Sequence, residues 1–226
     1  MTPPAASPPA ASPPAASPPA ADIAALFTRA DGQFLFARWG RPIVPVVFGV
    51  EEATISTLKG AIEAVVALAG HTMAETDPEL GANLMIFFVR DWAELTATPN
   101  LDRLIPDLAG TVARLVDAGA NQYRSFRFDP DGGIKAAFVF VRMDGELAAV
   151  PAETIALSQA VQTILLWSDT AFLGASPLAV LSEDGPAVLK PEIATIIRAG
   201  YDPILPVCAT DPSHALRLAA RIGRTA

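Results

Sequence analysis

Histidine and cysteine, from which most protein zinc sites are built, are almost absent from this chain of 226 residues. Its one cysteine, Cys208, excludes an internal disulfide, and a lone cysteine is more often inert than reactive. The two histidines, His71 and His214, lie far apart in the sequence. We therefore expect no zinc site of the usual kind and no other cofactor.

Positive charge is also scarce: 16 Lys and Arg residues face 24 Asp and Glu residues, which gives a net charge of −8. No run of basic residues offers the phosphate-neutralising face that nucleic-acid binding requires, so we expect no nucleic-acid partner. A protein or peptide partner is compatible with this composition. No apolar run approaches the roughly 18 residues of a membrane span, so we expect no transmembrane segment.

The N-terminal sequence lacks the charged and apolar regions of a secretory signal and instead repeats Pro-Pro-Ala-Ala-Ser. Proline fixes the backbone angle φ and removes hydrogen-bond donors, and the repeat has no bulky side chain to bury. We expect a disordered tail over residues 1–21 and a single folded domain over residues 22–226. The sequence as given predicts a cytoplasmic protein; a periplasmic or envelope location is expected if the true start lies upstream.

Hydrophobic patterning predicts an α+β domain. The continuous apolar run Leu84–Val89 is typical of a buried central strand, and residues 43–50 are rich in β-branched side chains. Residues 121–128 and 134–142 alternate around Asp131-Gly132-Gly133, which indicates a hairpin. Helices are expected over residues 22–30, 51–69, 100–118, 152–166, 191–199 and 212–222. This order favours a mixed, mostly antiparallel sheet with helices packed on it.

Most catalytic motifs are missing. No glycine-rich loop follows a predicted strand, as a phosphate-binding loop would. Gly174-Ala175-Ser176 does not have glycine on both sides of the serine, as a nucleophile elbow requires. The sequence therefore names no reaction by motif alone.

The predicted helix over residues 152–166 carries the one polar pattern with a catalytic parallel. At about 100° per residue, Ser158, Gln159 and Gln162 fall in one sector of the helix; we call them the polar trio. Zinc proteases place two ligands and a base at this spacing in the His-Glu-x-x-His helix. A hydroxyl and two carboxamides are poor zinc ligands, and a carboxamide cannot act as a general base near neutral pH.

The same helix carries a family resemblance. The stretch from Ser158 to Asp169 resembles the motif Glu-Glu-x-x-Gln-x-[Leu/Ile]-x-Leu-x-x-Asp, and a later helix ends in Tyr201-Asp202-Pro203-Ile204-Leu205. Residues 36–43 and 83–89 are similar to further segments of the same pattern. The pattern is that of an alphaproteobacterial family described as predicted secreted zinc-dependent proteases. The resemblance spans residues 34–206; the matching residues are Gln162, Ile164, Leu166, Asp169, Tyr201, Asp202, Pro203 and Leu205.

This resemblance implies a zincin-like fold, while Ser158 and Gln159 stand where the family has its two glutamates. The leading hypothesis is therefore a degenerate zinc-protease-like domain that is catalytically inactive and serves as a binding or envelope-associated accessory protein. The alternative is an active hydrolase, a peptidase with an unconventional site around Gln162 and Asp169, joined by one of the histidines. A third hypothesis is a structural module in which the polar trio is merely solvated.

Overall fold

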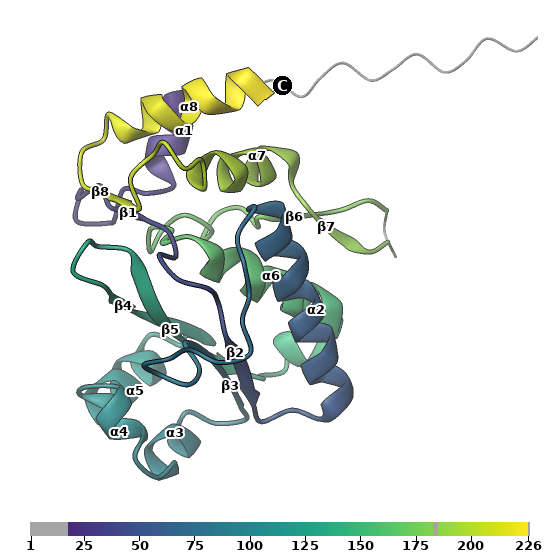
Figure 1. Ribbon diagram of the computed structural model, residues 1–226. Helices are drawn as coiled ribbons and strands as arrows, with labels where there is room; N and C mark the ends of the chain where they lie inside the picture. The colour runs from purple at the N-terminus through teal and green to yellow at the C-terminus, as the bar shows by residue number, and fades with distance from the viewer. Residues whose placement is uncertain (1–17, 183–184, 226) are drawn as a thin grey trace, which may run out of the picture.

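The computed structural model describes residues 18–182 and 185–225 (Figure 1). Its central sheet has the strand order β2-β3-β5-β4, formed by Pro45–Phe48, Leu84–Val89, Ile134–Arg142 and Gln122–Phe128. Strands β2, β3 and β5 are parallel to one another, and β4 is antiparallel to β5. The α+β class and the mixed sheet are thus confirmed, as is the predicted β4–β5 hairpin.

Two small antiparallel sheets accompany the central one. Strand β1 (Phe36–Ala37) pairs with β8 (Cys208–Ala209), and β6 (Leu178–Val180) pairs with β7 (Ala187–Leu189). Among the described strand pairs, three are antiparallel and two are parallel, and both parallel pairs lie in the central sheet.

Strand β3 lies inside the sheet, and helices cover both of its faces, which explains why its sequence is apolar throughout. Leu84, Ile86 and Phe88 point into one hydrophobic cluster. Met85 and Phe87 alternate with them and pack against a second cluster on the opposite face. Because successive strand residues point to opposite faces, one six-residue strand contributes to two cores.

Helices α2 (Glu52–Leu68) and α6 (Ala152–Ile164) pack against each other and cover one face of the sheet. The other face is covered by α3 (Ala93–Ala97), α4 (Leu101–Leu104) and α5 (Leu108–Asp117), which lie together below the sheet in Figure 1. Gly49 makes the tight turn from β2 into α2: its φ is +86°, and a Cβ there would lie 2.0 Å from the carbonyl oxygen of Phe88.

The start and the end of the described chain pack together. Helix α1 (Ala20–Ala25) contacts α8 (His214–Thr225), and α7 (Pro191–Gly200) packs on α8 at the top of Figure 1. Phe27 follows α1 and stacks on Trp167, with ring centroids 5.2 Å apart. The 3₁₀ turn Leu147–Ala149 leads into α6.

Proline breaks the helix that the sequence predicts over residues 100–118. Pro106 has no N–H to donate and disfavours helical geometry in the residue before it, so Ile105 is extended and the segment divides into α4 and α5. The β6–β7 hairpin was not predicted. Of the predicted tail, residues 1–17 lie outside the described residues, and α1 begins at Ala20, slightly before the expected boundary. No described helix has both the length and the apolar character needed to cross a membrane.

Candidate functional site

Helix α6 presents Ser158 and Gln162 on a half-buried side of the helix. The carboxamide of Gln162 donates a hydrogen bond of 2.8 Å to the Ser158 hydroxyl oxygen. This contact follows from their spacing, because residues four apart on a helix are neighbours. The two side chains therefore bond each other, and neither lines either of the two hollows described below.

Gln159, the third member of the polar trio, points into the protein and is only 1% exposed. Its Oε1 accepts a hydrogen bond of 3.0 Å from Nη2 of Arg124. Its Nε2 donates to Oε1 of Gln122 at 2.9 Å, and that oxygen also accepts from Arg124 Nη2 at 2.7 Å. Gln122, Arg124 and Gln159, here called the Arg124 cluster, thus join α6 to the edge strand β4.

Asp169, the fourth predicted site residue, is exposed beyond the end of α6. Its carboxylate accepts a hydrogen bond of 3.0 Å from the backbone N–H of Ala30. It therefore ties the segment after α6 to the turn after α1. No described hydrogen bond links it to Gln162, so the structure does not bring the proposed hydrolase pair together.

Arg124 was missed by the sequence analysis, and it carries the most unusual electrostatics of the region. Its Nε is buried without a partner, and no described carboxylate forms an ion pair with it. Burial lowers the pKa of Arg124 to about 10, because the charged form loses solvation. The available signal was strand alternation, which places Gln122 and Arg124 on the same face of β4.

Zinc, the metal that the family resemblance implies, does not fit these residues. The side chain that stands in the position of the family's second glutamate is Gln159, whose oxygen already bonds a guanidinium cation. A divalent cation at this position would be repelled by Arg124 and would have only neutral oxygens as ligands. Within residues 18–182 and 185–225, no group of three His, Cys, Asp or Glu side chains is arranged to hold a metal ion.

Both histidines form their hydrogen bonds and ring contacts away from the polar trio. His71 Nε2 lies 2.9 Å from the carbonyl oxygen of Arg41, and its ring packs on Tyr201. His214 is 1% exposed, and its ring centroid lies 4.5 Å from that of Phe36. Neither of its ring nitrogens has a hydrogen-bond partner among the described residues. Burial lowers the pKa of each, so both are neutral at pH 7.

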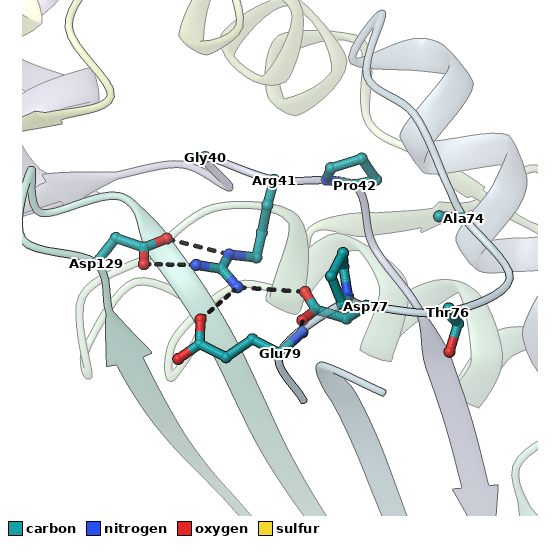
Figure 2. A pocket seen from close by; sticks show the side chains of 9 residues that line it. Gly40, Arg41, Pro42, Ala74, Thr76, Asp77, Glu79 and Asp129 are labelled. Carbon is teal, nitrogen blue, oxygen red and sulfur yellow. Dashed lines mark hydrogen bonds and ion pairs between the residues drawn. The ribbon is translucent and has the colours of Figure 1, made fainter. Parts of the chain in front are cut away.

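A second charged cluster surrounds Arg41 at the end of the sheet where the parallel strands begin (Figure 2). Asp129 accepts hydrogen bonds from Arg41 Nε at 3.1 Å and from Nη2 at 2.6 Å. Arg41 Nη1 reaches Asp77 at 3.3 Å and Glu79 at 3.2 Å, and Lys135 also pairs with Glu79. These five residues are here called the Arg41 cluster. Four of them, all except Lys135, line a hollow of about 410 Å³ together with Gly40 and Pro42.

The carboxylate of Asp77 is 3% exposed and is held ionised. Burial raises its pKa, but hydrogen bonds from the backbone N–H groups of Leu80 and Glu79, from Asn83 and from Arg41 outweigh burial and lower the pKa to about 2. Asn83 also bonds the backbone at Val44 and Pro42. The Arg41 cluster thus ties loops together, with the guanidinium at the centre of the three carboxylates.

A smaller hollow of about 260 Å³ lies between the ends of α7 and α8. It is lined by Arg198, Asp202, Arg221 and Arg224, and Arg221 pairs with Asp202 at 3.3 Å. Both helices end here, and the negative ends of their dipoles favour arginine at these positions. The cluster is therefore explained by helix stability without any ligand.

Comparisons with known proteins add no family to this description: no protein-family model matches the chain, and no match is found among the curated proteins or the solved structures.

Proposed function

We propose that the chain is a catalytically inactive binding protein built on a degenerate zinc-protease-like, zincin-like domain. One observation carries the proposal: Gln159 Oε1 accepts a 3.0 Å hydrogen bond from Arg124 while the side chain is 1% exposed. The position at which the resembling family has a carboxylate is thus filled by a neutral group held against a cation. Such a group can neither attract zinc nor remove a proton from water.

The rest of the polar trio supports the same function. Ser158 is the acceptor of Gln162, and neither lies beside a general base: the hydrogen bonds and ring contacts of His71 and His214 are to Arg41, Tyr201 and Phe36. A serine nucleophile needs a base within hydrogen-bond reach. The hydrolase alternative around Gln162 and Asp169 therefore has no observation in its favour. An envelope location is supported by the resemblance alone.

The test combines zinc content with proteolysis. The protein is purified without a histidine tag, because a tag binds zinc, and is dialysed against zinc and then against buffer before elemental analysis. We expect well below one zinc per chain and no cleavage of an unfolded generic substrate such as casein.

Variants make the result specific. A His71→Ala variant reports adventitious zinc binding, since His71 forms no contact with the polar trio in the described structure. Stoichiometric zinc that is retained by His71→Ala but lost in Gln159→Ala, together with cleavage that Gln159→Ala abolishes, would overturn the proposal.

A further inference from the structure

Strand β4 is an open edge of the central sheet. It stands last in the strand order and pairs only with β5 among the described residues. No backbone hydrogen bond or isolated bridge joins Gln122–Phe128 to another described segment on the outer side. Such an edge offers a row of free N–H and C=O groups to which another strand can add.

The side chains of this edge strand are basic and aromatic, with no acid among its seven residues, Gln-Tyr-Arg-Ser-Phe-Arg-Phe. Arg124 faces α6, whereas Arg127, three residues later, faces the side of α4, where its Nη2 donates to the carbonyl oxygen of Leu104 at 3.1 Å. Arg127 also donates to Ser125 Oγ at 3.1 Å and has no carboxylate partner in the described structure. The chain as a whole is acidic, so this strand is a local exception.

The positive charge of the Arg124 guanidinium is incompletely compensated by its neighbours. Its Nη2 bonds two neutral carboxamide oxygens, its Nε is buried without an acceptor, and its Nη1 makes no hydrogen bond to the described residues. A half-buried guanidinium without a carboxylate is costly, and charge-assisted bonds to a carboxylate are about twice as strong as neutral ones. A carboxylate placed beside Arg124 would therefore be bound favourably.

We propose that β4 binds an extended acidic segment of another protein by strand addition. On a strand paired with β4, the residues opposite Arg124 and Arg127 are three apart and point to opposite faces of the sheet, with side chains about 5 Å from their partners. The segment bound best has acidic residues at positions i and i+3. This inference rests on the proposed binding function and names its surface and its class of partner.

Two other occupants fit less well. Residues 1–17 of this chain contain no acidic residue, so they cannot supply a carboxylate to either arginine. A second copy paired through its own β4 would bring four arginines onto one short sheet, and like charges on neighbouring strands are destabilising. Charge therefore selects an acidic partner over both.

The experiment measures binding of the labelled peptide Thr-Val-Glu-Thr-Val-Glu-Thr to the full chain by fluorescence anisotropy. A control peptide has Gln at both Glu positions, and a second control has N-methyl groups on alternate backbone nitrogens. We expect the acidic peptide to bind at least about tenfold more tightly than the Gln peptide. N-methylation should weaken binding by a similar factor, because strand addition needs the peptide's N–H groups.

Matched variants locate the site. Arg124→Met should weaken binding about fivefold or more, and so should Gln159→Glu, which supplies Arg124 with an internal carboxylate and leaves the strand intact. Arg198→Met, which removes the same charge from α7, should change the affinity less than about twofold. Hydrogen exchange of β4 amides should slow when the acidic peptide binds.

Equal affinity for the acidic and Gln peptides, an unchanged affinity in Gln159→Glu, or protection confined to another strand would each overturn the inference. A dimer that forms through β4 in sedimentation would do the same. These outcomes are separate from the zinc and proteolysis test. A protein without protease activity that does not bind the peptide would contradict only the proposal for β4. Zinc-dependent protease activity would contradict the proposed function.

Discussion

Arg41 and Arg124 are both half-buried arginines of the same fold, yet their surroundings are opposite in charge. Three carboxylates, Asp77, Glu79 and Asp129, surround Arg41. Two carboxamides, Gln122 and Gln159, surround Arg124. The first arrangement pairs the guanidinium with carboxylates and ties loops together. The second leaves the guanidinium without a carboxylate partner among the described residues.

The two surroundings should make opposite contributions to stability. Removing a partner from a buried ion pair leaves an uncompensated charge, which is strongly destabilising, whereas replacing an uncompensated buried charge by an apolar side chain is often neutral or stabilising. Substitutions at Arg41 should therefore cost more stability than substitutions at Arg124.

The largest effect is expected for Arg41→Met. This change leaves the buried Asp77 and its neighbour Asp129 without a counter-ion, so the free energy of unfolding should fall by about 3 kcal/mol in urea denaturation. Arg41→Lys should lose less, because one ammonium group retains part of the attraction but cannot make the two parallel bonds to Asp129. A loss below about 1 kcal/mol would contradict the structural role of the Arg41 cluster.

The contribution of the Arg41 cluster to the unfolding free energy should also decrease in acid. The pKa of Asp77 is lowered to about 2 from an ordinary value of 3.8, so its contribution is fully present above about pH 4 and is lost as the pH falls through 2. A shift of this size corresponds to about 2 kcal/mol of unfolding free energy. Denaturation at a series of pH values measures it, and Asp77→Asn should flatten the curve in that range. An unchanged curve in the variant would assign the acid sensitivity to other carboxylates.

A moderate gain in stability is expected for Gln159→Glu. The new carboxylate would stand where a neutral oxygen now accepts from Arg124, so the unfolding free energy at pH 7 should rise by about 1 kcal/mol. In an Arg124→Met background the same change should give no gain and should cost stability, since the glutamate would be buried unpaired. This double-mutant cycle isolates the pair. A coupling near zero would mean that Arg124 is already compensated.

The smallest effect is expected for Arg124→Met alone. It removes a poorly compensated charge but leaves Gln122 and Gln159 with fewer hydrogen bonds, so the two contributions oppose each other. The unfolding free energy should change by less than about 1 kcal/mol, in contrast to Arg41→Met. Similar losses for the two variants would remove the distinction between the clusters.

Periodicity in the sequence was enough for the framework of the fold. The run Leu84–Val89 matched its strand residue for residue, since helices on both faces demand apolar side chains at every position. The hairpin of β4 and β5 was likewise predicted from alternation around a glycine turn. The predicted helix over residues 100–118 failed at Pro106, although proline chemistry gave the reason in advance.

The candidate site was less accessible to the same reasoning. Helical spacing predicted the neighbours Ser158 and Gln162, which do hydrogen-bond, but it could not show that Gln159 turns toward a strand and meets Arg124. That contact joins residues 35 positions apart, and no local pattern encodes it. The same holds for Arg41 and Asp129, which are 88 positions apart.

The packing of α1 against α8 and of β1 against β8 has a consequence for synthesis on the ribosome. Ile23 and Phe27 are fully buried, and part of their cover comes from α8, at the far end of the sequence. At typical translation speeds, about 10 to 40 seconds pass between the synthesis of these two residues and the synthesis of α8. During this interval Ile23 and Phe27 lack the part of their cover that α8 provides, so the packing of α1 is completed late.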